Sequence, residues 1–215
     1  MSTRLSEETW GPWPALRLAS SRVALLLVPA LGGRVVSLAD LGSGREWLVQ
    51  GGPLSEEQAR EWAGEEAVFG GQVSFGWDEC LPTVAPCPDP LHPEGAPLRD
   101  HGDQWGRAAE SEWHAEAAVL KTSWQRSRWR YGFSRRLSFE DPTTVRAEYS
   151  LVNASERPMP LLWSIHPVLR LEPGSRLEVP GVASARLTWS NGLGVPSEEV
   201  AWPHAHRADG SLADL

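Results

Sequence analysis

The distribution of apolar residues along the chain predicts a series of short β-strands. Residues 22–28 form an apolar segment rich in branched side chains that ends at Pro29, a pattern typical of a buried strand. Gly32 and Gly33 then predict a turn, and residues 34–39 alternate enough to be the hairpin partner of the first strand. A further short strand is expected at residues 46–49.

Farther along, period-two alternation predicts an antiparallel meander with one buried and one solvent-facing side. Turn residues at 140–142 and 153–158 separate the expected strands. These strands cover residues 115–122, 128–139, 144–153, 160–171 and 183–189.

The segment between the two groups of strands has a different character. A serine followed by early glutamates predicts one short helix within residues 53–67. Residues 69–106 are dense in glycine, proline and aspartate, and so long a loop in a compact domain is usually functional. The pattern as a whole predicts one all-β domain over residues 1–215, a length that β-sandwiches often use.

Composition narrows the partners and the compartment. The formal net charge of −8 repels phosphate backbones, so nucleic acid is not expected as a partner. The longest apolar run, residues 23–31, is far shorter than the roughly 20 residues that span a bilayer, and the first residues lack a leader-like apolar core, so a cytoplasmic protein is expected. In that reducing compartment Cys80 and Cys87 are expected as two partly buried thiols; seven residues apart, with no second pair, they are a weak zinc signal.

Tryptophan is unusually frequent, with 12 residues against four phenylalanines and two tyrosines. An indole ring offers a flat apolar face and one N–H donor, which suits the apolar faces and hydroxyls of a sugar. Most of these rings are expected to pack in the core. Trp77, Trp105 and Trp163 are the candidates for sugar binding, because each lies inside a charged motif.

Two charged motifs lie in the loop-rich segment. Asp78 and Glu79 are adjacent, so on an extended chain they point to opposite faces; one is expected to bind a sugar hydroxyl or to hold a histidine or arginine, and the alternative is a solvated acidic turn. His101 stands between Asp100 and Gly102, where a carboxylate can orient the ring and glycine lets the backbone bend. Arg107 is spaced to reach the same pocket, whereas the alternative for His101 is an isolated surface histidine.

Another histidine, His166, interrupts an apolar strand, and Pro167 ends regular pairing behind it. Imidazole titrates near neutral pH and is suited to proton transfer, although a core histidine bonded to the backbone is the alternative. His204 and His206 could share one face of a strand and, with His101, bind a metal. No third ligand stands at a diagnostic spacing, so no metal is expected.

Four of these stretches together resemble the aldose 1-epimerase (galactose mutarotase-like) superfamily, over about residues 23–190. The resemblance implies an all-β fold, a large antiparallel β-sandwich of the supersandwich kind, with a sugar cleft on one face and no metal or organic cofactor. The stretches are residues 29–38, 76–83, 100–105 and 163–167.

By the same resemblance, sugar anomers interconvert by acid–base ring opening. His166 looks like the general acid, His101 like its partner at the ring oxygen, and Arg107 like a hydroxyl-binding group. Asp100, Asp78, Glu79 and the three tryptophans named above complete the implied sugar site.

Two departures from the family pattern bear on activity. Residues 168–170 after His166-Pro167 are Val-Leu-Arg, where the best-known members have an aromatic residue and an asparagine, so the chain looks closer to a mutarotase-related branch. Members also carry a base glutamate near the C-terminus, and Glu198 and Glu199 do not match its context. Three hypotheses stay open: an epimerase-like isomerase, a non-catalytic carbohydrate-binding protein, and a form lacking the last C-terminal strands, with a monomer or homodimer expected in each case.

Overall fold

The computed structural model describes residues 2–51, 57–58, 68–69, 74–124, 129–187, 198–207 and 209–214. These residues are almost entirely in antiparallel β-structure, which confirms the predicted all-β class. They fall into two compact units, Met1–Arg170 and Leu171–Leu215, and the single domain over 1–215 stays a prediction. Within the part that the structure describes, no helix has the length and apolar character needed to cross a bilayer.

The first sheet of the larger unit has six strands in the order β1-β2-β3-β4-β5-β10. The predicted hairpin is confirmed as β3 and β4, joined through a short 3-10 turn at Pro29–Leu31. β1 and β2 were not predicted. β1 is largely exposed on both sides and so lacks the alternation that marks a strand. The strands are β1 (Arg4–Trp10), β2 (Trp13–Ala19), β3 (Val23–Val28), β4 (Arg34–Asp40), β5 (Trp77–Cys80) and β10 (Ser164–Pro167).

The second sheet is a four-stranded meander in sequence order, as the alternation predicts. Its first strand was not predicted, and the strand expected at 115–122 begins later because residues 115–117 form a 3-10 turn. The strands are β6 (Glu110–His114), β7 (Val119–Trp124), β8 (Tyr131–Phe139) and β9 (Val145–Asn153).

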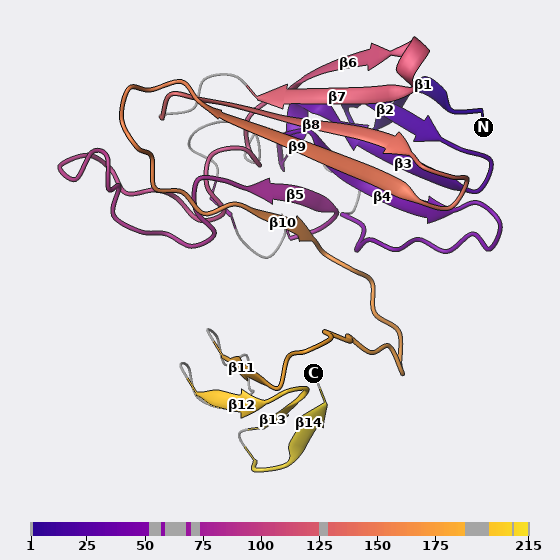
Figure 1. The fold of residues 1–215 in the computed structure, drawn as a ribbon. Coiled ribbons are helices and arrows are strands. Elements are labelled where there is room, and N and C mark those ends of the chain that lie inside the picture. The colour runs from indigo at the N-terminus through magenta and orange to yellow at the C-terminus, as the bar shows by residue number, and fades with distance from the viewer. Residues whose placement is uncertain are drawn as a thin grey trace. The chain divides into compact units, whose positions relative to one another are not determined.

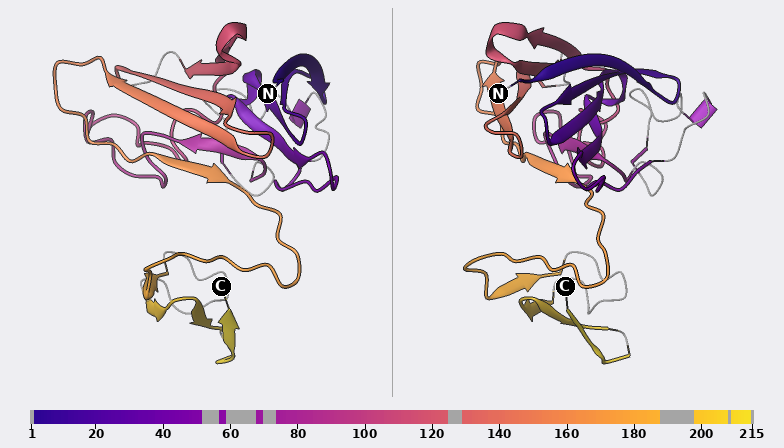
Figure 2. Two further views of the ribbon diagram at one scale, coloured as in Figure 1. Left: turned by 45° about the vertical axis from the view of Figure 1, so that its right-hand side comes forward. Right: turned by 90° about the vertical axis from the view of Figure 1, so that its right-hand side faces the viewer.

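The two sheets pack face to face as a β-sandwich, with the β6–β9 layer lying over the β1–β4 layer (Figure 1; Figure 2). Apolar side chains from both layers form one buried cluster, which includes Leu25 and Val35 from the first sheet and Leu120 and Leu137 from the second. Burial of these side chains drives the association of the layers.

β5 and β10 bring distant parts of the sequence together at the edge of the first sheet. They pair antiparallel, with Asp78 opposite His166 and Cys80 opposite Ser164. The strand predicted over 160–171 is therefore much shorter, Ser164–Pro167. The prediction of a strand at 46–49 was wrong, because only isolated bridges form there, from Glu46 to Ala39 and from Leu48 to Leu169.

The described residues of the smaller unit contain two short antiparallel strand pairs. β11 (Ser184–Arg186) pairs with β12 (Glu199–Ala201), and β13 (His204–His206) pairs with β14 (Leu212–Asp214). The strand predicted at 183–189 corresponds to β11, although residues 188 and 189 lie outside the described residues. The helix predicted within 53–67 also lies largely outside them.

Candidate functional site

Strand β5 separates its four side chains onto two faces of the first sheet. Successive side chains of a strand point to opposite sides, so Asp78 and Cys80 share one face and Trp77 and Glu79 share the other. All four are buried. The predicted divergence of Asp78 and Glu79 is confirmed, and the two carboxylates take part in different clusters.

Asp78 holds a histidine and an arginine at once. Its Oδ1 lies 3.0 Å from Nδ1 of His166, its partner across the sheet, and its Oδ2 lies 3.5 Å from a guanidinium nitrogen of Arg34. Arg34 also donates a 2.7 Å hydrogen bond to the carbonyl of Phe75. Burial lowers the pKa of Arg34, and the nearby charge of Asp78 acts against this shift.

His101 lies on a turn that is pressed against the end of β5. The residue has a φ of 59° and Gly102 one of 73°, both in the left-handed region. A Cβ on Gly102 would overlap the backbone carbonyl of Leu81, and the Asp103 N–H donates to that same carbonyl at 2.7 Å. Glycine is therefore required for the close approach that places His101 beside β5.

The His101 ring is buried and held by its neighbour in the sequence. Nδ1 lies 2.9 Å from Oδ1 of Asp100, whose backbone carbonyl accepts a 3.1 Å hydrogen bond from the Trp105 indole. Burial lowers the pKa of His101, and the hydrogen bond to Asp100 opposes that shift.

The two predicted catalytic histidines lie next to each other. Their ring centroids are 4.7 Å apart at an interplanar angle of 65°, and each ring has a carboxylate at Nδ1. Phe69 stacks on His101 with a centroid distance of 3.5 Å and meets Trp105 edge-on. The buried Cys80 thiol completes this group, which we call the histidine cluster: Cys80, His101 and His166 each offer a ligand atom within 4.8 Å of the others.

Glu79 forms a second cluster on the opposite face of β5, inside the sandwich. Its Oε1 accepts hydrogen bonds from Arg135 at 2.9 Å and Tyr149 at 3.0 Å, and its Oε2 accepts one from Trp163 at 3.2 Å. Burial raises the pKa of Glu79, while the charge of Arg135 opposes the shift. Arg135 also lies over the Trp77 ring, 5.1 Å from its centroid.

The structure therefore divides the predicted site residues into two groups. His101, His166, Asp78, Asp100 and Trp105 gather around the histidine cluster, and Trp77, Glu79 and Trp163 lie with Arg135 on the other side of the sheet. The remaining predicted residue, Arg107, is half-buried at the end of a turn in which its N–H donates to the carbonyl of Gln104 at 3.2 Å.

Comparison with solved structures agrees with this architecture, although no protein-family model and no curated protein matches the sequence. A galactose mutarotase-like protein from Clostridium acetobutylicum aligns over 78% of this chain with 18% identity and a TM-score of 0.58. One from Lactobacillus casei aligns over 94% with 11% identity and a TM-score of 0.64. The chain has the galactose mutarotase-like fold. It spans 54% of the first protein and 67% of the second.

Sequence reasoning missed several residues that organise the candidate site. Arg34 and Arg135 were not singled out, yet both are buried in strands and hold Asp78 and Glu79. A signal for Arg135 was present, because it follows Phe133 and precedes Leu137 on the buried, period-two face of β8. Cys80 was expected only as a partly buried thiol. Its position two residues after Asp78 on a strand indicates that the two side chains share one face of the sheet.

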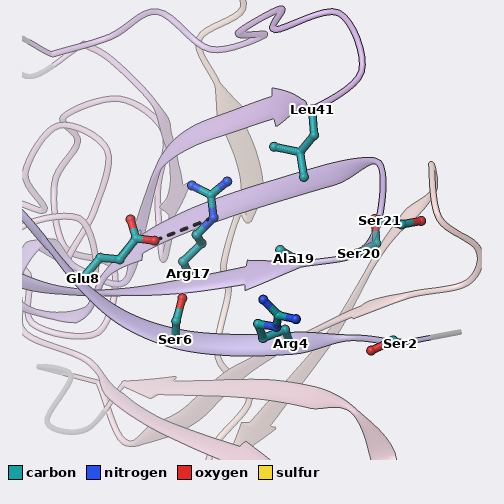
Figure 3. A pocket seen from close by; sticks show the side chains of 9 residues that line it. All are labelled: Ser2, Arg4, Ser6, Glu8, Arg17, Ala19, Ser20, Ser21 and Leu41. Atoms are coloured by element: carbon teal, nitrogen blue, oxygen red, sulfur yellow. Dashed lines mark ion pairs between the residues drawn. The ribbon is translucent and has the colours of Figure 1, made fainter.

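The sandwich has a pocket of about 480 Å³, which none of the predicted site residues lines. It lies over β1 and β2, where Arg17 approaches Glu8 with a nitrogen–oxygen distance of 3.7 Å (Figure 3). Its lining is mostly small and polar and brings no pair of proton-transfer groups together. The histidine cluster is therefore the better candidate for chemistry.

Proposed function

We propose that this protein interconverts the anomers of a free sugar by acid–base ring opening, with His166 and His101 transferring the protons. The observation that carries the proposal is the pair of adjacent imidazoles, 4.7 Å apart, each held by its own carboxylate. The hydroxyl and the ring oxygen of an anomeric centre are bonded to the same carbon. Two neighbouring proton-transfer groups therefore suit this reaction.

The surroundings of the two rings favour one as the proton acceptor and the other as the proton donor. His101 is the more buried ring, and burial favours its neutral form, so we assign it the proton of the anomeric hydroxyl rather than the role at the ring oxygen that the family resemblance implies. As the bond from the anomeric carbon to the ring oxygen breaks, His166 donates a proton to that oxygen and the aldehyde forms. Rotation of the aldehyde end and the reverse transfers give the other anomer. Arg107, which is half-buried, would bind hydroxyls of the sugar, whereas Trp105 is buried and donates its indole N–H to the carbonyl of Asp100.

The test is the rate of anomer exchange for a panel of aldoses, followed by polarimetry after dissolving one pure anomer. We expect acceleration by the native protein and a loss of about 100- to 10,000-fold in His166→Asn and His101→Asn, the usual contribution of a general acid or base. His204→Asn is the matched control, because this exposed histidine lies in β13 of the smaller unit. The proposal fails if no aldose equilibrates faster with the protein than without it.

A second candidate, a non-catalytic carbohydrate-binding protein, is favoured by the state of the two carboxylates on β5. Asp78 is engaged by His166 and Arg34, and Glu79 by Arg135, so neither is placed as an additional base. Calorimetry that detects sugar binding, together with polarimetry that detects no acceleration, would select this alternative. For either function we propose the cytoplasm as the compartment, where Cys80 and Cys87 would remain the free thiols that they are here.

A further inference from the structure

We propose that the histidine cluster is a transition-metal site, in which Cys80, His101 and His166 bind one zinc-like divalent cation. The three residues come from three separate places in the sequence, and one donor atom of each lies within 4.8 Å of the other two. One sulfur and two imidazole nitrogens form a donor set that suits zinc and its neighbours rather than magnesium or calcium. The inference does not depend on the proposed epimerase activity, which would belong to the metal-free protein because a bound cation occupies the ring nitrogens that would transfer protons.

The hydrogen bonding of the two histidines is that of metal ligands. Asp100 faces Nδ1 of His101 at 2.9 Å and Asp78 faces Nδ1 of His166 at 3.0 Å. A ring that donates Nδ1–H to a carboxylate keeps the lone pair on Nε2, and metal-binding histidines commonly have such a carboxylate behind them. The carboxylate also fixes the orientation of the ring, which lowers the entropy lost on binding.

The charges around Cys80 favour a cation as well. Asp78 and Asp100 lie against the two histidines, and one guanidinium, that of Arg34, lies 3.5 Å from Asp78, so two negative charges and one positive charge lie next to the donors. A bound cation would displace the proton of the thiol, and the thiolate would neutralise part of the charge of the cation. Phe69 and Trp105 supply the apolar wall on one side.

The donors are close to the spacing that tetrahedral zinc needs. Bond lengths of about 2.3 Å to sulfur and 2.0 Å to nitrogen place tetrahedral ligands about 3.4 Å apart. The donors lie up to 4.8 Å apart, so they must close by about 1.4 Å on binding, and the His166 side chain, 32% exposed, has room to move. Three protein ligands leave a fourth position for water, as in zinc sites that bind a further ligand.

Cobalt binding tests the inference directly. The chelator-treated full chain is titrated with Co²⁺, with an expected stoichiometry of one ion per chain, a thiolate-to-cobalt charge-transfer band and the intense visible bands of a tetrahedral site. Zn²⁺ should displace the cobalt. Cys80→Ser should abolish the charge-transfer band, and His101→Asn or His166→Asn should weaken binding at least about tenfold. Asp100→Asn, which keeps the ligands, should weaken it about 10- to 100-fold.

Two matched controls separate this cluster from other donors of the chain. Cys87→Ser removes the other cysteine, and the double variant His204→Asn/His206→Asn removes the histidine pair of β13; both should bind cobalt like the native protein. A native protein that binds no cobalt, or a charge-transfer band that survives Cys80→Ser and disappears with Cys87→Ser, overturns the inference.

A measurement without substitutions covers the case in which Cys80→Ser does not fold. Native protein loaded with ¹¹³Cd²⁺ should give one cadmium resonance at a shift characteristic of a single thiolate with nitrogen ligands. A shift characteristic of oxygen ligands alone overturns the inference. Polarimetry on the zinc-free protein measures anomer exchange, whereas the cobalt and cadmium experiments measure metal binding. Failure of the epimerase proposal can therefore be told apart from failure of the metal proposal.

Discussion

His166 lies directly opposite Asp78 on the neighbouring strand, with its Nδ1 atom 3.0 Å from Oδ1 of that carboxylate. The two residues are 88 positions apart in the sequence, and the pairing of β5 with β10 places both side chains on one face of the sheet. His101 has the same relationship to Asp100, its neighbour in the chain. Each histidine is thus held by a carboxylate at Nδ1, in one case across the sheet and in the other from the preceding residue.

This arrangement predicts the tautomers of both rings. In the neutral state His101 and His166 should carry the proton on Nδ1, and ¹⁵N chemical shifts from long-range proton–nitrogen spectra measure this directly. Asp78→Ala should release His166 toward the other tautomer and leave His101 unchanged, whereas Asp100→Ala should do the reverse. Equal effects of both substitutions on both rings would contradict the assignment.

The buried pair of Glu79 and Arg135 should dominate the stability of the sandwich interior. Both side chains are fully buried, so Arg135→Met should lower the free energy of unfolding by about 3 to 5 kcal/mol because it leaves Glu79 without its cation. The double variant Glu79→Gln/Arg135→Met should lose less than the sum of the single variants, since no buried charge is left unpaired and the glutamine carbonyl still accepts from one of the two donors, Tyr149 or Trp163. Urea unfolding followed by tryptophan fluorescence measures these differences.

The control for that cycle is an exposed pair of similar geometry. Arg146 and Glu140 are separated by 2.7 Å and are both about half exposed. Glu140→Gln should change the free energy of unfolding by at most about 1 kcal/mol, because solvent screens surface ion pairs. Comparable losses at the two sites would show that burial does not set the strength of the Glu79–Arg135 interaction.

Gly102 should tolerate no side chain, because a Cβ atom would collide with the backbone of Leu81. Comparison with Gly44 separates this collision from the cost of the left-handed backbone conformation. Gly44 has the same φ of 73° with open space around its Cβ position, whereas a Cβ on Gly102 meets the backbone of Leu81. Gly44→Ala should cost about 1 to 2 kcal/mol from the left-handed backbone alone. Gly102→Ala should cost about 1 to 3 kcal/mol more from overpacking, and the His101 resonances should shift. Equal losses would mean that the contact with Leu81 does not constrain the turn.

Asp141 should give the β8–β9 turn a pH-dependent stability. Hydrogen bonds from the Thr144 hydroxyl and then from the backbone and hydroxyl of Thr143 lower the pKa of Asp141 to about 2. Because the folded pKa is below that of the unfolded chain, the stabilisation is present above about pH 4 and is lost as the pH falls toward 2. Asp141→Asn should therefore unfold at lower urea than the native protein at pH 7, with the gap narrowing below pH 4. A gap that is constant with pH would contradict this origin.

Much of the larger unit could be predicted from local pattern. The continuous run that ends at Pro29 marks a strand that is packed on both faces, and the alternation through Phe133 and Tyr149 marks strands with one more buried face; burial is what produces both patterns. β1 could not be found in this way, because most of its residues are exposed. Strands of three residues, such as β12 and β13, are too short to show a period.

The sequence by itself determined the all-β class, the divergence of Asp78 and Glu79, and the local pairing of His101 with Asp100, because each follows from strand geometry or from adjacency along the chain. Only the tertiary structure decided that Asp78 holds His166, that Glu79 holds Arg135, and that Cys80 joins the two histidines. The first two contacts join residues 88 and 56 positions apart, and all three depend on strand register and sheet packing, for which no local pattern contains the information.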